Sequence, residues 1–493
     1  MFQPTTPQKI PLRLRVAFAI VVIIVIAAQA VKWRALRTMP THPDAVFYLN
    51  IGSHYIERGG LTPYMWRLPD DSNIIAGSGT GYGILLLTEW LRVFGLTFTA
   101  GRVLMYLLGI ATIFAMFAMV RVWYGLYAGV VAAGLWAVST TPFFSFQLRM
   151  DSPGMLAYAL ALWLHVSAVK SGKLWQHFAT AVALVLCAQF HILAVMYIGA
   201  VTFYYVIDLI AGVVRQRGAV NWRPFAAYAL GGALAGGIYI AVQVLPNPEA
   251  YFLIAQDCPA CVPAGLEKEI ARYRGFFRAR PFEVILLGLA IVAAVWRWQP
   301  RDRHWLLLLI GAVLSYAVVS PPSQVEYIAH TAPLTFAGIA ALFIPGFRRR
   351  KSALPHRYAV LAAQAVLLLL LGINNFRTNL FSGIARPDFP PIVTIRELDL
   401  PRDTVIMGEF RWYGDLLDYP LYLQYGTEEQ YGMTLRGEDY LAFWARERPQ
   451  VFIGDPSGDA LLVDYMAEYA FVEMQPGLWL DGDLCADHNC DGA

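Results

Sequence analysis

Residues 99–120 read TAGRVLMYLLGIATIFAMFAMV, and Arg102 near the start is the only charge in this stretch. A helix crosses the hydrocarbon core of a bilayer with about 20 apolar residues, so this stretch predicts a membrane-spanning helix. Apolar runs of about 18 or more residues recur along most of the chain. The sequence therefore predicts an all-α polytopic membrane bundle.

The composition agrees with this fold class. Of the 493 residues, 57% are hydrophobic and 15% are charged, whereas about 25% are charged in a typical soluble domain. We expect about eleven spans of this kind. They lie near residues 14–31, 99–120, 125–145, 152–169, 175–190, 192–212, 225–246, 283–297, 304–320, 327–346 and 357–374.

The distribution of charge divides the chain in two. Residues 1–376 hold 30 Lys and Arg and 14 Asp and Glu, whereas residues 377–493 hold 8 and 21. We therefore expect a transmembrane domain over 1–375 and an acidic domain over 376–493. An acidic domain binds nucleic acid poorly, so we expect no nucleic-acid partner. The acidic part has strand-like runs at 404–407 and 451–454, helix-like stretches around 438–447 and 459–469, and a hairpin around Gln475-Pro476-Gly477. These patterns predict a small α/β unit.

Basic residues predict the orientation in the membrane. With a cytoplasmic N-terminus, the inner segments carry 17 Lys and Arg, and the short outer loops carry only Arg149. Outer loops then span 32–98 and 247–282, and the α/β domain is extracytoplasmic. Gly83 to Leu96 is apolar but short, so we interpret it as a re-entrant or interfacial helix. We expect a multi-pass protein of the cell membrane, bacterial by its Ala-rich, Arg-over-Lys composition.

The N-terminal apolar stretch and the cysteines leave alternatives open. Val16 to Val31 has the form of a signal peptide, but the following Lys32-Trp33-Arg34 lacks small residues for cleavage, which favours a retained helix. The pairs Cys258/Cys261 and Cys485/Cys490 fall on the outer side, where disulfides persist. A C-x-x-C such as Cys258/Cys261 also binds metal, although no second C-x-x-C or H-x-x-H completes a zinc site.

Two aspartates, Asp44 and Asp151, stand beside apolar spans on the outer side. Carboxylates at a membrane boundary are costly and usually functional. Asp44 begins a short amphipathic segment in which Tyr48 and Tyr55 share a face, and Tyr64 follows a pair of glycines. Each aspartate has a structural alternative as a helix N-cap, Asp151 for a helix that begins at Ser152-Pro153.

These motifs occur in a recognisable order. They are Asp44-Ala45-Val46-Phe47-Tyr48 with Gly60-Leu61-Thr62-Pro63-Tyr64, then Pro142 with Arg149-Met150-Asp151, then Glu326-Tyr327 with His330-Thr331-Ala332-Pro333. The series resembles the GT-C glycosyltransferases, closest to the bacterial branch of aminoarabinose transferases and protein mannosyltransferases. The resemblance implies a polyprenyl-phosphate sugar donor and an extracytoplasmic acceptor, which could be a lipid, a glycan or a protein. The chain departs from many relatives at Ala45, where they have Glu.

The residues suit this chemistry. An inverting displacement at the anomeric carbon needs a base for the acceptor hydroxyl, and we assign Asp44. The leaving phosphate needs cations, and the candidates are Arg149, Arg272, Arg274, Arg278 and Arg280. Asp151 could orient Arg149, contact the acceptor or help to hold a divalent metal. Arg149 and Asp151 are two residues apart, so we expect them to meet only in an extended segment.

The remaining candidates are contacts to the substrates or to a metal. They are Tyr48, Tyr55, Tyr64, His191, Glu326, Tyr327 and His330. For His191 the alternative is a packing residue, and for Glu326 and His330, four apart, it is a hydrogen-bonded pair at a helix interface. Competing functions are a flippase or transporter of lipid-linked saccharide, which would show repeats and broken helices, and a non-catalytic scaffold for envelope assembly. The sequence shows no repeat.

Overall fold

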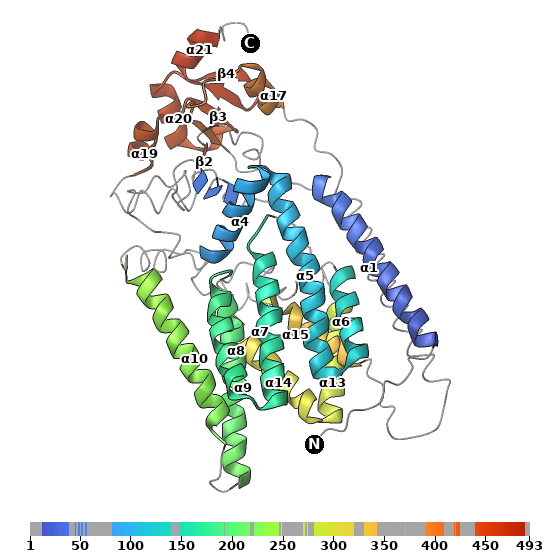
Figure 1. Ribbon diagram of the computed structural model, residues 1–493. Coiled ribbons are helices and arrows are strands. Elements are labelled where there is room, and N and C mark those ends of the chain that lie inside the picture. Colours follow the sequence, from blue (N-terminus) through green and yellow to red (C-terminus); the bar gives the residue numbers. More distant parts are fainter. Residues whose placement is uncertain are drawn as a thin grey trace.

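A helical bundle carries a small sheet-containing domain at one end (Figure 1). The computed structural model describes most of the chain in segments, which are 12–38, 81–139, 148–191, 193–216, 221–245, 281–319, 330–342, 390–408 and 439–488. It also describes short pieces at 45, 48–49, 51–52, 55–56, 248, 270–271, 274, 370, 419 and 421–423.

The helices of the bundle follow the expected spans from residue 14 to residue 342. They are α1 (Leu12–Thr38), α5 (Phe98–Tyr124), α6 (Leu126–Val138), α7 (Asp151–Ser171), α8 (Leu174–Ala188), α9 (Ala194–Gln216), α10 (Arg223–Tyr239) with a π-helical turn (Ile240–Val244), α13 (Pro281–Arg297), α14 (Pro300–Val319) and α15 (Ala332–Leu342). Some neighbours along the chain pack together, namely α5 with α6, α7 with α8, α8 with α9, and α13 with α14. Helices farther apart in sequence also pack together, namely α5 with α7, α8 with α10, and α9 with α14. The alternation of long helices and short turns thus produces a bundle.

Only part of the expected span count is confirmed. Within the described part of the chain, four helices are long and apolar enough to cross a membrane by length and composition: Phe98–Tyr124, Asp151–Ser171, Ala194–Val214 and Arg223–Val242. The span expected over 125–145 is shorter, because α6 ends at Val138, three residues before Thr141-Pro142, where proline disfavours helix. The span expected over 357–374 lies outside the described residues apart from Leu370. A total of eleven remains a prediction.

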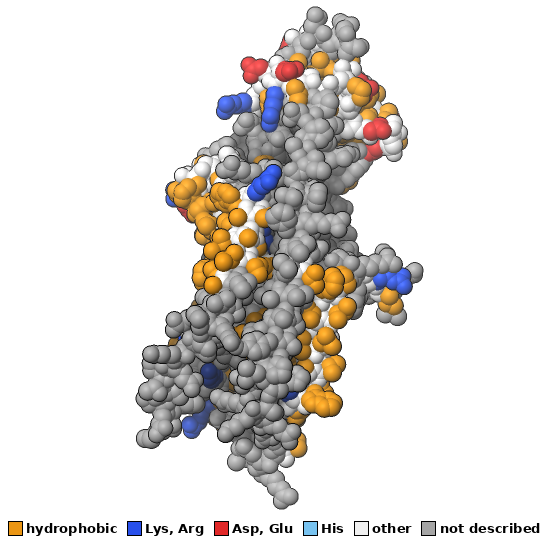
Figure 2. All heavy atoms as spheres, turned by 90° about the vertical axis from the view of Figure 1, so that its right-hand side faces the viewer, with side chains coloured by type: hydrophobic (Ala, Val, Ile, Leu, Met, Phe, Trp, Pro, Cys, Tyr) orange, Lys and Arg blue, Asp and Glu red, His pale blue; other side chains and the backbone are white. Residues whose placement is uncertain are grey.

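Large side chains fill the interior of the bundle and apolar ones also cover its outside. Trp136, Tyr158, Tyr197, Trp305 and Phe336 are among the largest fully buried side chains. Many large hydrophobic residues of the helices are exposed, and Figure 2 shows hydrophobic side chains on the bundle and acidic ones on the domain above it. An apolar outer surface of this extent suits a bilayer.

The short segment expected at Gly83 to Leu96 forms α4 (Gly81–Phe94), a helix of 14 residues. A helix of this length covers about 21 Å, less than the hydrocarbon core of a bilayer. Leu87 and Leu91 of α4 are buried in one cluster with Leu49 and Ile51 from the loop between α1 and α4. The indole of Trp90 donates a hydrogen bond to Ala100 O of α5 at 2.8 Å. α4 therefore joins that loop to the bundle.

The C-terminal domain is a mixed sheet with helices. The strands β1 (Ile406–Gly408), β2 (Leu421–Leu423), β3 (Val451–Ile453), β4 (Val472–Gln475) and β5 (Leu478–Leu480) pair in the order β2-β1-β3-β5-β4. β1 is parallel to β2 and β3, and β5 is antiparallel to β3 and β4. The expected hairpin is confirmed as β4–β5, with Gly477 at φ 80° in its turn, a conformation that favours glycine.

The described helices of this domain are α17 (Pro390–Glu397), α19 (Tyr440–Glu447), α20 (Ala460–Glu468) and α21 (Gly482–His488). Asp439 accepts from Ala442 N and Asp459 from Leu462 N, which caps α19 and α20. Cys485 is disulfide-bonded and Cys187 is a free, buried thiol. Cys258, Cys261 and Cys490, like the boundary expected at 376, lie outside the described residues.

Candidate active site

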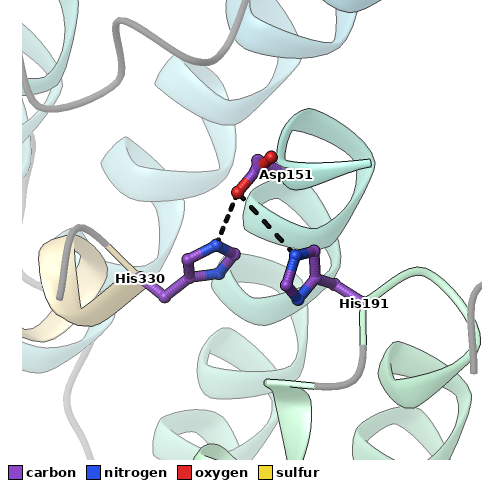
Figure 3. A group of neighbouring side chains, drawn as sticks. All are labelled: Asp151, His191 and His330. Carbon is purple, nitrogen blue, oxygen red and sulfur yellow. Dashed lines mark hydrogen bonds and ion pairs between the residues drawn. The ribbon is translucent and has the colours of Figure 1, made fainter. Parts of the chain in front are cut away.

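Asp151 is the first residue of α7, at the end of the bundle nearest α4 and the α/β domain (Figure 1). Gly83 N of α4 donates to Gln189 O at 3.2 Å, which joins α4 to the turn between α8 and α9. His191 lies in the same turn. The start of α7, the α8–α9 turn and the segment before α15 meet at this point, as Figure 3 shows.

A buried carboxylate is the centre of the cluster. Arg149 Nε donates to Asp151 Oδ2 at 2.8 Å, and His330 Nε2 lies 2.7 Å from Asp151 Oδ1. His191 Nε2 lies 3.8 Å from the same Oδ1. All four side chains are buried. A buried carboxylate is stable only when it is paired and hydrogen-bonded, and here both oxygens have partners.

Arg149 and Asp151 meet in a way that differs from the expectation. Met150 between them has φ −71° and ψ −4°, which is not extended backbone. The two side chains meet because Arg149 precedes the helix and a turn at Met150 folds it back. The alternative in which Asp151 caps α7 is wrong, because the helix begins at Asp151 and its cap residue, Met150, makes no side-chain capping bond.

His191 is part of the cluster. Its Nδ1 accepts from Leu193 N at 3.3 Å, and its ring centroid is 4.4 Å from that of His330. Burial, with His330 as the second cause, lowers the pKa of His191 to about 3, so the ring is neutral at pH 7. A neutral ring that accepts at Nδ1 carries its proton on Nε2, the nitrogen nearest Asp151.

Two tyrosines support the histidines. Tyr197 of α9 donates a short hydrogen bond to His330 O, and Tyr158 of α7 donates to His191 O at 3.4 Å. The Tyr158 ring also lies 5.7 Å from the His330 ring, centroid to centroid. Neither tyrosine is predicted from the sequence, because a tyrosine inside an apolar span has no local signal that distinguishes support of a site from packing.

The structure accounts for some of the other predicted site residues. Tyr55 donates to Glu89 of α4 at 2.7 Å, and this bond is the main cause of a lowered pKa at Glu89. Tyr48 packs beside the α4 cluster, and Arg274 is exposed. The rest lie outside the described residues: Asp44, Tyr64, Arg272, Arg278, Arg280, Glu326 and Tyr327. The expected pairing of Glu326 with His330 is therefore untested, and the partner seen for His330 is Asp151.

The cluster also has the donor atoms of a metal site. One ligand atom each from Asp151, His191 and His330 lies within 4.8 Å of the others. One carboxylate and two imidazoles form a ligand set typical of divalent transition metals. The arrangement could thus hold a divalent cation.

Comparisons with known proteins agree on the fold. The family profile described as dolichyl-phosphate-mannose-protein mannosyltransferase matches residues 83–233. No curated protein sequence matches the chain.

Among solved structures, ArnT from Cupriavidus metallidurans bound to undecaprenyl phosphate is similar with a TM-score of 0.62 and 14% identity, over 90% of this chain and 94% of ArnT. The oligosaccharyltransferase of Archaeoglobus fulgidus in its apo form is similar with a TM-score of 0.55 and 11% identity, over 92% of this chain and 71% of that one. Its complex with Zn and sulfate has a TM-score of 0.52 and 11% identity, over 88% and 68%. The chain therefore has the fold of these proteins, the GT-C fold that the resemblance predicted.

Proposed function

We propose that this protein transfers a sugar from a polyprenyl-phosphate donor to an acceptor outside the cytoplasm. The observation that carries the proposal is the buried Arg149–Asp151–His330 cluster, at the end of a GT-C bundle that lies toward the α/β domain. The similar ArnT structure is bound to undecaprenyl phosphate, a lipid phosphate of the class proposed here. The acceptor class, whether lipid, glycan or protein, is left open.

The proposed reaction is one inverting displacement. Asp44 takes the proton of the acceptor hydroxyl, the acceptor oxygen bonds to the anomeric carbon, and the bond from that carbon to the phosphate oxygen breaks. The electron pair leaves with the polyprenyl phosphate, whose growing negative charge needs a cation. Of the two described candidates, Arg149 and Arg274, Arg149 is the one in the cluster, where Asp151 orients it by holding Nε.

Donor turnover tests the proposed base. Asp44→Asn keeps the size of the side chain and removes its basicity, so we expect transfer from a radiolabelled polyprenyl-phosphate sugar to fall by roughly 10²–10⁴-fold. Expression and elution on gel filtration should match wild type. Asp70→Asn, a change of the same kind elsewhere in that outer loop, serves as the control. Full turnover by Asp44→Asn would remove Asp44 from the mechanism.

A second role for the cluster is to hold a divalent metal. The ligand set of Asp151, His191 and His330 favours it, and the similar Archaeoglobus fulgidus oligosaccharyltransferase has a structure with Zn. The bond from Leu193 N to His191 Nδ1 opposes it, because a proton on Nε2 must move before that nitrogen can bind metal. Such a site would lie beside Arg149 and could share the charge of the phosphate.

Metal removal distinguishes a cluster that holds a metal from one in which Asp151 acts only through Arg149 and His330. If the cluster holds a metal that catalysis needs, EDTA abolishes turnover, added Zn²⁺ or Mn²⁺ restores it, and His191→Gln weakens the metal affinity by roughly 10–100-fold or more. If Asp151 acts only through Arg149 and His330, turnover survives EDTA and elemental analysis finds no metal in stoichiometric amount. The matched control is His177→Gln, at a buried histidine of α8 that bonds Tyr205 instead.

A further inference from the structure

A cavity of about 960 Å³ lies between α7, α9, α13 and α14. Its wall includes Lys170, near the last residue of α7. Asp151 begins the same helix, and the rise per residue places the two about 28 Å apart along the helix axis. The cavity therefore lies at the opposite end of the bundle from the candidate active site and is separate from it.

Basic side chains dominate the charges of this cavity. Among the described residues that line it are three cations, Lys170, Arg301 and Arg303, and one carboxylate, Asp208. Lys170 Nζ donates to Val122 O at 3.3 Å, and the Arg301 guanidinium lies 5.7 Å from the Tyr124 ring centroid. Those contacts hold the two cations at the end of the bundle and leave them their positive charge. The lining thus favours an anion.

Arg303 gives a second, independent sign of a ligand. Its Nε is buried and has no hydrogen-bond partner among the described residues. An unsatisfied buried donor costs about 1–3 kcal/mol, and more for a charged group. His304 also lines the cavity, but its Nε2 is taken by His165 Nε2 at 2.9 Å. An acceptor oxygen in the cavity would satisfy Arg303.

The rest of the wall is apolar. It includes Ile207, Ala211, Ile291, Val295, Leu307 and Ile310. Val295 is 54% exposed and Ile310 is 46% exposed, so the cavity opens on the outer face of the helices, where acyl chains would lie. A ligand that fits both parts has an anionic head and hydrocarbon tails.

We propose that this cavity binds the phosphate headgroup and upper acyl chains of an anionic glycerophospholipid, from the leaflet farther from the α/β domain. The phosphate accepts from Arg303 and pairs with Lys170 and Arg301. The tails lie along Ile207, Val295 and Ile310. The bound lipid fills the space between α7, α9, α13 and α14 and stabilises their packing. It lies at the end of the bundle opposite the candidate active site.

Lipid retention measured by native mass spectrometry tests this site. The probes are dioleoylphosphatidylglycerol, dioleoylphosphatidylcholine and inorganic phosphate, each added to the delipidated full-length protein. Wild type should retain phosphatidylglycerol in preference to phosphatidylcholine. The triple variant Lys170→Gln/Arg301→Gln/Arg303→Gln should lose roughly 10- to 100-fold of that affinity, since each cation near a lipid phosphate contributes substantially. Phosphate alone should not displace the lipid, because it lacks the tails.

The control matches the charge change at the same end of the bundle. Arg121→Gln/Lys173→Gln/Arg223→Gln removes three exposed cations that do not line the cavity, and it should keep the affinity within about twofold, because cations outside the cavity contribute little after screening. An equal loss in both triple variants would mean general attraction to a basic surface and would overturn the proposal. Displacement of the lipid by inorganic phosphate would overturn the assignment of a lipid.

A variant of unchanged charge tests whether the lipid enters the cavity. Ala211→Trp fills the apolar wall and should abolish preferential retention of phosphatidylglycerol, although all three cations remain. Retention at the wild-type level would show that the lipid binds outside the cavity. Arg303→Gln alone serves if the triple variant elutes as an aggregate, and an unchanged affinity in this single variant would also contradict the site.

Discussion

At the scale of single residues, the cluster around Asp151 illustrates how a carboxylate is kept inside a bundle. Both of its oxygens are hydrogen-bonded, one by a permanent cation and one by an imidazole. Removing one partner of a buried ion pair leaves an uncompensated charge, at a cost of roughly 3–5 kcal/mol, whereas neutralising the carboxylate as well lowers that cost. The relative stability of variants at Arg149 and Asp151 is therefore predictable.

We predict that Arg149→Met destabilises the protein more than the double variant Arg149→Met/Asp151→Asn. The single variant keeps a buried carboxylate without its cation, and the double variant does not. The difference should be about 1–3 kcal/mol of unfolding free energy, measured as the shift of the denaturation midpoint in detergent. If the double variant lost as much unfolding free energy as Arg149→Met and Asp151→Asn lose together, Arg149 and Asp151 would not interact. Both variants should lack transfer activity.

At the scale of elements, α15 is positioned by close packing. Trp305 of α14 is fully buried and its indole donates to Leu334 O of α15 at 2.8 Å. Gly338 lies against the same ring, so that a Cβ on it would overlap Trp305 Cζ2. α15 begins at Ala332, two residues after His330. The packing of α15 against Trp305 therefore affects the position of His330 at the site.

Gly338→Ala should destabilise the bundle by roughly 1–3 kcal/mol, because the buried indole has no room to move away from the new methyl group. The transfer rate should fall as well, since α15 would shift with His330. Thermal denaturation and turnover measure the two effects. Gly288→Ala on α13 is the control, because no atom lies within 4 Å of the methyl group it would add. Equal thermal denaturation midpoints for the two variants would mean that packing against Trp305 does not position α15.

At the scale of the whole molecule, the two ends of the bundle differ in chemistry. One end carries the buried Asp151 cluster and the acidic α/β domain (Figures 1 and 2). The other has Lys170, Arg301 and Arg303 around a cavity. Basic residues concentrate on the cytoplasmic side of membrane proteins, so this polarity supports an extracytoplasmic α/β domain and active site.

Labelling with a membrane-impermeant maleimide in intact cells tests this orientation. Glu468 of α20 and Lys173 before α8 are both exposed, at the domain and at the opposite end of the bundle. Glu468→Cys should react from outside, and Lys173→Cys should react only after the cells are permeabilised, with the wild-type protein as background. The reverse pattern would place the Asp151 cluster in the cytoplasm and exclude the proposed acceptor side.

The sequence by itself determined the helical class, the positions of most described helices, the short α4, the hairpin and the positions of α19 and α20 in the α/β domain. These features follow from apolar run length, alternation and turn residues, all of which act within a few residues of the chain. It also selected Asp151, Arg149, His191 and His330 as candidates.

Only the tertiary structure decided which candidates meet. Asp151 and His330 are 179 residues apart in sequence, and Tyr158 and Tyr197 support the site from within apolar spans. A helix that is apolar all round has no polar stripe to show which face turns inward. Its rotation is settled by packing, through contacts such as Gly338 on Trp305. For the same reason the cavity at the opposite end of the bundle, where Lys170 and Arg303 come from helices distant in sequence, had no local signal.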